Sequence, residues 1–213
     1  MKLQLISAVA LLVASAQAVV VQYDFDGALP QGLPNPAGGL VYPANTGYHG
    51  TFTFETTTPP TGGGAFTTTY ALLDFSLTFD PGGSAATIAF PGGQVSVTDD
   101  PGGDEFEIRG GFGTPPTGDV VNGVFLNFFE IRLNYSDNSG TAFANLDLPG
   151  GHLTESDFLD GHTAVFDYED GGFNFATEEG NMDNLSGATI PEPSAALLLF
   201  GALGWGVLLR RRK

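Results

Sequence analysis

Proline–glycine–glycine triplets recur along the middle of the chain and divide it into short segments. The triplets begin at Pro81, Pro91, Pro101 and Pro149, and the first three are ten residues apart. Proline fixes one backbone torsion, and glycine adopts the positive φ that many tight turns require. Turns at this spacing leave room for strands of about five to seven residues. Because the intervening sequences differ from one another, the triplets predict a meander of β-hairpins rather than a repeat architecture.

Between these turns, apolar and polar residues alternate with a period of two, which is typical of strands with one buried face. In the clearest run, Leu73, Phe75, Leu77 and Phe79 share one face. The same pattern predicts further strands at 20–26, 51–55, 85–90, 94–98, 105–109, 129–135, 142–148, 163–168 and 172–177.

These strands, with no amphipathic helix between them, predict an all-β domain. We expect an antiparallel β-sandwich, jelly-roll-like, over residues 19–189. Its core should be rich in phenylalanine, because all 18 phenylalanines except Phe200 lie in the central region. Two stretches rich in Pro, Gly or Thr, 27–47 and 56–69, are predicted to be long loops.

Acidic residues dominate this central region. Only Arg109 and Arg132, of seven basic residues, lie between positions 19 and 190, whereas every one of the 24 acidic residues except Glu192 lies there. Domains that bind nucleic acids neutralise phosphates with clustered Lys and Arg. The charge therefore argues against a nucleic-acid partner.

The N-terminal residues have the three parts of a secretory signal peptide. Lys2 supplies a positive start, residues 3–14 are mostly apolar, and Ala16 and Ala18 form a small-x-small cleavage site. We expect a signal peptide at 1–18 that brings the chain to the export machinery and is cut by signal peptidase after Ala18. The alternative is a retained anchor, but the apolar run is shorter than the ~20 residues that span a bilayer.

The last part of the chain combines a proline-containing tripeptide, an apolar run and a basic end. These are Pro191, Glu192 and Pro193, then residues 194–209, then Arg210, Arg211, Arg212 and Lys213. A transmembrane helix over the apolar run would be about 24 Å long, close to a hydrocarbon core of ~30 Å. Four consecutive cations favour the cytoplasmic side, which leaves the central region outside the inner membrane. By itself this pattern also fits a permanent tail anchor.

Ile190 followed by Pro-Glu-Pro, a short glycine-containing apolar run and a basic end resembles the PEP-CTERM sorting signal, also described as an ice-binding protein C-terminal domain. The resemblance covers residues 190–213. It implies that a Gram-negative bacterium exports the protein, that the inner membrane holds it transiently as a single-pass precursor, and that an exosortase cuts near the tripeptide. It further implies delivery of the body to the cell surface or extracellular matrix, often together with exopolysaccharide. The usual residue before the first proline is Val.

Enzyme motifs are scarce in this sequence. The chain has no cysteine and no lysine between Lys2 and Lys213, which removes thiolate and Schiff-base chemistry from the body. Nucleophile elbows, His-Glu-x-x-His motifs and phosphate-binding loops are likewise missing from the sequence. We therefore predict a non-enzymatic protein with a structural or adhesive role. A pair of carboxylates, as in glycosidases, is the enzymatic alternative.

A carbohydrate-binding module acting on exopolysaccharide is the main alternative function. Such modules often stack sugars on exposed Trp or Tyr. The single tryptophan, Trp205, lies in the apolar tail run, so that only the six tyrosines could serve. Ice binding would need a regular array of threonines, and the triplet at 67–69 is too short for one.

Calcium is the cofactor that the acidic residues could hold, because it takes about six to eight oxygen ligands. Residues 181–186 resemble the closing strand of exported β-sandwich domains that precede this tail, and the resemblance implies pairing with residues 21–27. That pairing would bring Asp24, Asp26 and Asp183 together as a calcium site. The alternative is that acidic turns only keep an exported protein soluble. Two other candidate sets are Asp99 and Asp100 with Asp104 and Glu105, and Asp167 with Glu169 and Asp170.

Overall fold

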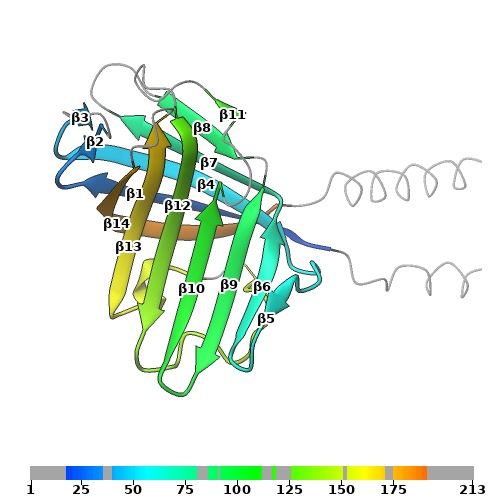
Figure 1. Cartoon of the computed structure of the whole chain (residues 1–213). Helices are drawn as coiled ribbons and strands as arrows, with labels where there is room; N and C mark the ends of the chain where they lie inside the picture. The colour runs from blue at the N-terminus through cyan, green and yellow to red at the C-terminus, as the bar shows by residue number, and fades with distance from the viewer. Residues whose placement is uncertain are drawn as a thin grey trace, which may run out of the picture. The chain divides into compact units, whose positions relative to one another are not determined.

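The computed structural model describes residues 18–35, 40–80, 86–90, 92–111, 117–118, 126–150, 153–170 and 175–190. They form a compact domain, Val20–Ile190, shown in Figure 1. Most of the described residues are in strands, and the one helical element among them is a single 3-10 turn, η2 (Glu155–Asp157). The all-β prediction is therefore confirmed. The predicted signal peptide up to residue 17 and the predicted sorting segment from residue 191 lie outside the described residues.

The described part of the chain contains fourteen strands. Their bounds are β1 (Val20–Leu29), β2 (Leu33–Pro34), β3 (Leu40–Tyr42), β4 (Thr46–Glu55), β5 (Gly62–Gly63), β6 (Thr67–Leu72), β7 (Asp74–Asp80), β8 (Ala86–Phe90), β9 (Gly93–Asp100), β10 (Gly103–Gly110), β11 (Thr117–Gly118), β12 (Leu126–Asp137), β13 (Gly161–Asp170) and β14 (Phe175–Ile190). A search of the same residues finds no helix whose length and apolar character would let it cross a membrane.

Twelve of the strands form one antiparallel sheet in the order β11-β8-β7-β4-β1-β14-β13-β12-β10-β9-β6-β5, and β2 and β3 form a separate pair. The large sheet curls, and its strands form two groups, β14 to β11 and β13 to β5. In Figure 1, β1, β4 and β7 of the first group run across behind the strands of the second. We call these groups the back half and the front half. The antiparallel prediction is confirmed, with both halves belonging to one continuous sheet. Jelly-roll connectivity stays a prediction.

β14 lies at the boundary and connects the back half to the front half. Its residues from Phe175 to Asn181 pair with β13, and those from Asn181 to Ile190 pair with β1. Asp183 is the extra residue of a β-bulge, because Asp26 faces Asn184 while Gly27 faces Met182. A bulge bends its strand and increases the twist, which fits a strand at the curl. The predicted pairing between 181–186 and the first strand is confirmed.

Leu73 marks a second passage between the halves, and its predicted burial is wrong. Phe75, Leu77 and Phe79 are fully buried, whereas Leu73 is 50% exposed. The chain turns there from β6 in the front half to β7 in the back half, and the Leu73 amide donates a hydrogen bond to the Thr53 carbonyl at 2.8 Å. β7 therefore begins at Asp74, and its first buried residue is Phe75 rather than Leu73.

The triplet turns do not all close hairpins. β9 pairs with β10 across the turn at 101–103, and β7 pairs with β8, as predicted. β8 and β9, however, lie in different halves of the sheet, so the hairpin predicted at 91–93 is wrong. Gly92 has a φ of 123°, and a Cβ on Gly93 would lie 2.2 Å from the Arg109 carbonyl oxygen. The glycines there allow a crossing between the halves.

The segment predicted as a strand at 142–148 is not one. It lies in an irregular loop that packs on the core, with Leu148 buried and Phe143 against Phe106 and Phe158. Its alternating apolar residues make core contacts without strand pairing. Conversely, the predicted loops 27–47 and 56–69 contain the short strands β2, β3 and β5. These strands are two or three residues long, too short to show an alternating pattern in the sequence.

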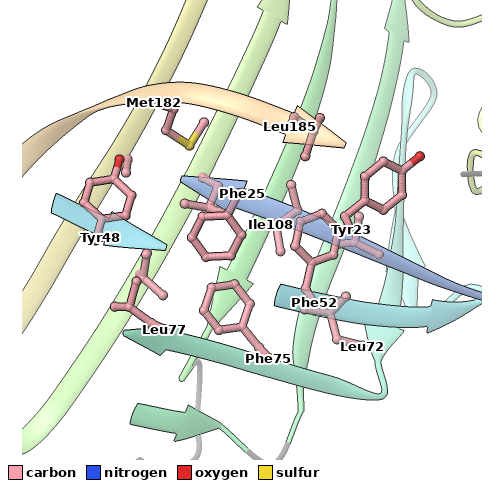
Figure 2. Close-up of a cluster of buried hydrophobic side chains, with 14 of the residues drawn as sticks. Tyr23, Phe25, Tyr48, Phe52, Leu72, Phe75, Leu77, Ile108, Met182 and Leu185 are labelled. Atoms are coloured by element: carbon pink, nitrogen blue, oxygen red, sulfur yellow. The ribbon is translucent and has the colours of Figure 1, made fainter. Parts of the chain in front are cut away.

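Aromatic rings fill the space between the two halves. Phe52 of β4 stacks on Tyr23 of β1 at a centroid distance of 5.2 Å, and it contacts Phe75 of β7 at 6.5 Å. Phe106 of β10 reaches Phe52 from the front half at 6.2 Å. Figure 2 shows Tyr23, Phe52 and Phe75 within this cluster, together with Ile108 of the front half. The prediction of a core rich in phenylalanine is confirmed.

Phe52→Ala is expected to lower the free energy of unfolding by about 3–5 kcal/mol, because it leaves a cavity at the centre of the aromatic cluster. Phe66→Ala is the matched control, since Phe66 is 50% exposed, and its effect should stay within about 0.5 kcal/mol. Urea denaturation followed by tyrosine fluorescence measures both. Equal effects for the two variants would contradict the packing described here.

Candidate functional site

Charged side chains gather on the outer face of the front half. Successive residues of a strand point to opposite faces, and the register places Arg109 directly opposite Arg132 across β10 and β12. Together with four carboxylates around them, these arginines form what we call the charged face: Glu105, Glu107, Arg109, Glu130, Arg132 and Asp167. The two basic residues of the central region are thus neighbours, although 22 positions separate them in the sequence.

Each arginine of the charged face is held by carboxylates. Arg109 donates to both oxygens of Glu107, from Nε at 2.7 Å and from Nη2 at 3.2 Å. Arg132 donates from Nη2 to Asp167 Oδ2 at 2.7 Å, and its Nε lies 3.9 Å from Glu130 Oε1. Both arginine side chains are partly buried, with 32% of each exposed. These pairs offset the repulsion between two like charges that face each other across the strands.

Burial alters the acidity of two carboxyl groups on the charged face. It raises the pKa of Glu130, whose side chain is 12% exposed, while Arg109 and Arg132 oppose this effect. It also raises the pKa of Glu105, with a further contribution from the charge of Glu107. The charged face therefore presents carboxylates and guanidinium groups whose positions are fixed by hydrogen bonds and ion pairs with one another.

Hydroxyl groups extend the polar surface toward the edge of the front half. Thr67 and Thr69 of β6 pair through their hydroxyls with Thr98 and Ser96 of β9, at 3.0 and 3.2 Å. Thr177 donates to Asp167 Oδ1 at 2.6 Å on the other side of the arginines. The result is a continuous run of hydroxyl, carboxylate and guanidinium groups across the sheet.

The tyrosines, in contrast, are all core residues. None of the six is more than 5% exposed: Tyr23, Tyr42, Tyr48, Tyr70, Tyr135 and Tyr168. Three of them hold other segments, since Tyr48 donates to the Asn181 carbonyl, Tyr70 to the Leu146 carbonyl and Tyr168 to the Pro34 carbonyl. Desolvation raises the pKa of the Tyr42, Tyr48 and Tyr168 hydroxyls. Sugar stacking on an exposed tyrosine is therefore not available to this domain.

The predicted calcium residues come together only in part. The β1–β14 pairing places Asp26 opposite Asn184, with Asp183 in the adjoining bulge, and Asp24 opposite Ser186. Two of the three carboxylates accept hydrogen bonds from side-chain amides: Asn184 donates to Asp26 Oδ2 at 3.3 Å, and Gln22 donates to Asp24 Oδ1 at 3.0 Å. Among the residues that the structure describes, no three acidic or histidine side chains are grouped so as to hold a metal ion. Calcium at this place stays a prediction.

The two other acidic sets are divided between different surroundings. Asp104 points into the core and Glu105 away from it, because they are consecutive in β10. Asp100 accepts a hydrogen bond from the Gly102 amide within the β9–β10 turn. Asp167 belongs to the charged face, while the side chains of Glu169 and Asp170 lie outside the described part of the structure.

A pair of buried aspartates closes the inner side of the front half, and sequence reasoning did not single it out. Asp104 and Asp137 face each other across β10 and β12 and are 2% and 1% exposed. Asp137 accepts hydrogen bonds from the amides of Ser139 and Thr141 at 2.9 and 3.0 Å and from their hydroxyls. Asp104 accepts one from the Phe143 amide at 2.8 Å. The sequence indicated Asp104 only as a member of the acidic set with Asp99, Asp100 and Glu105, and no local pattern connects it to Asp137.

Asp137→Asn is expected to destabilise the domain at neutral pH, and this destabilisation should shrink progressively as the pH falls below ~4. The hydrogen bonds from Ser139 and Thr141 hold the pKa of Asp137 far below its ordinary value. Their stabilisation is present above the unfolded-state pKa of about 4 and is lost as pH falls from there toward the lower folded-state value. Melting temperatures from pH 2.5 to 7 measure the difference, with the exposed Asp147→Asn as control. A difference that does not shrink in acid would contradict this account.

Comparison with known proteins concerns the end of the chain. A family model described as the PEP-CTERM protein-sorting motif matches residues 189–213, which include the last two residues of β14. The comparisons with curated proteins and with solved structures give no match. The motif indicates an exported protein of a Gram-negative bacterium that an exosortase recognises and that is processed at the membrane. The chain therefore carries a PEP-CTERM protein-sorting motif at residues 189–213.

Proposed function

We propose that this protein is delivered by an exosortase to the cell surface or extracellular matrix, where the central domain acts without catalysis in a structural or adhesive role. The observation that carries the proposal is the sorting motif directly after a compact β domain. A transient inner-membrane precursor is part of the proposal: residues 194–209 would span the membrane, and Arg210–Lys213 would remain in the cytoplasm.

The surface of the domain fits a solvated environment outside the cell. Its two arginines are already paired with carboxylates, so the remaining surface charge is strongly acidic. Such charge favours solubility and attracts divalent cations. Structural calcium and a jelly-roll connection of the strands belong to this proposal as well.

The ends of the sheet also suit a protein that accumulates outside the cell. Among the residues that the structure describes, the outermost strands are β5 and β11, and each is two residues long. Short edge strands limit the pairing of one sheet with the edge of another. The domain can therefore be present at high local concentration with little tendency to aggregate through its edges.

Replacing Pro191, Glu192 and Pro193 together by alanine is expected to abolish release, so that the full precursor accumulates in the inner membrane. Mass spectrometry of the released and membrane fractions measures this. The exposed Glu179→Ala on β14 serves as the control and should be released normally. A released chain that still contains Trp205 would contradict processing near the motif.

Binding to exopolysaccharide is the second candidate function, and the charged face is the observation that favours it. Paired guanidinium and carboxylate groups, flanked by threonine hydroxyls, can donate and accept several hydrogen bonds from a sugar chain. The burial of all tyrosines means that such binding would depend on polar contacts rather than stacking.

If the charged face binds polysaccharide, Arg109→Gln together with Arg132→Gln should weaken binding at least tenfold. A glycan array and titration with the producer's own exopolysaccharide measure this, and melting curves check that the variant folds. Thr78→Val in the back half is the control. Absence of binding by the unmodified protein would leave only the structural or adhesive role.

A further inference from the structure

We propose that the last five residues of β14, residues 186–190, form a detachable strand end that supplies the exosortase with enough free chain to reach the sorting motif. The inference rests on the proposed function. It concerns how a folded domain that ends immediately before its sorting motif can be processed at a membrane.

The strand end is paired with β1 but does not contribute a side chain to the core. Its register runs from Ser186 opposite Asp24 to Ile190 opposite Val20. Gly187 is partly buried, the other four residues are exposed, and Ile190 is 40% exposed. By contrast Leu185, the residue just before it, is 0% exposed. Figure 2 shows Leu185 and Met182 directed from β14 toward the aromatic cluster. Leu185 is therefore the last residue of β14 that packing holds in place.

Only one strand holds the strand end along its length. On the opposite side of β14, β13 pairs no further than Asn181, and Thr154 makes a single bridge to Ser186. For residues 187–190, β1 is the sole strand partner within the described part of the chain. The strand end is thus attached mainly by backbone hydrogen bonds to β1.

β1 can stay in place when the strand end leaves. It pairs with β4 along its whole length, from Val20 opposite Glu55 to Leu29 opposite Thr46. Val21 and Tyr23, which lie beside the strand end, are both 0% exposed. Detachment would therefore expose one backbone edge of β1 and leave its core side chains packed.

The need for free chain follows from the sequence next to Ile190. Only residues 191–193 separate it from the apolar run that begins at Ser194, and three extended residues span about 10 Å. A protease that binds its substrate as an extended strand must fit between the domain and the membrane. Detaching residues 186–190 adds about 17 Å. Proline has no N–H to donate to a strand ladder, so the two prolines of the motif favour detachment that begins at this end of β14.

A disulfide across the strand end tests the proposal in the full-length precursor, produced in the exosortase-containing bacterium. Gln22 and Ala188 face each other directly in the β1–β14 register, and directly opposite residues have Cβ atoms about 4.5–5.5 Å apart, close to disulfide geometry. The chain has no cysteine of its own, so Gln22→Cys with Ala188→Cys creates a single possible bridge. We expect release to slow at least tenfold when the bridge forms and to recover when dithiothreitol is added to the cells. Thiol labelling verifies the bridge.

Two further variants show whether the disulfide acts by shortening the free chain before the sorting motif or in some other way. Thr78→Cys with Thr87→Cys joins β7 to β8, where the two hydroxyl oxygens lie 2.9 Å apart, and should leave release unchanged. Inserting eight Gly and Ser residues between Ile190 and Pro191 of the bridged precursor should restore release without reduction.

The possible failures have different meanings. Release of the bridged precursor at the normal rate, with the bridge intact, would overturn the inference and leave the sorting proposal standing. Slow release that the insertion does not restore would also overturn it. Absence of exosortase-dependent release of the unmodified protein would overturn the sorting proposal, and the inference with it.

Discussion

The contact between Phe52 and Phe106 connects the two halves of a single curled sheet, and much of the remaining structure depends on it. Phe52 belongs to the back half and Phe106 to the front half, so their packing at 6.2 Å fixes how the sheet closes on itself. The backbone makes room for these rings. A Cβ on Gly110 would lie 2.7 Å from the Phe75 ring, and one on Gly50 would lie 2.5 Å from the Phe25 ring. The register that buries the aromatic residues also decides which residues face outward, because a shift by one would exchange the two faces. The charged face is therefore a consequence of the aromatic core.

The sequence predicted those features that depend on local pattern. The alternation of apolar and polar residues predicted most of the long strands. In a regular strand every second side chain faces the core, so this pattern indicates one buried face. It failed at Leu73, where the chain turns between the halves, and at 142–148, where apolar residues reach the core from an irregular loop. The proximity of Arg109 and Arg132 depends on the pairing of β10 with β12 across a long intervening segment, which no local pattern encodes. The pairing of the first and last strands and the sorting motif were both predicted from resemblances, which short runs of residues carry.

The surface of the domain is acidic, and its two arginines do not change this because carboxylates pair with both of them. With each guanidinium group engaged by Glu107, Glu130 or Asp167, the domain offers other molecules carboxylates and hydroxyls more than cations. Such a surface repels anionic polymers in the absence of divalent ions. Association with an acidic matrix would then vary with the ionic composition outside the cell, whereas a neutral polysaccharide would meet no such barrier.

The position of β14 in the sheet has a consequence for the order of events during export. A chain that crosses the membrane from its N-terminus delivers β1 first and β14 last, yet these strands are direct neighbours. Until β14 arrives, β1 and β13 each have an unpaired edge, and contacts between the chain ends are slow to form because they close the longest loop. The sheet is thus completed only when the sorting motif itself reaches the membrane. Translocation, folding and recognition of the sorting motif would therefore coincide. A chain shortened before β14 would lack both the strand that completes the sheet and the sorting motif.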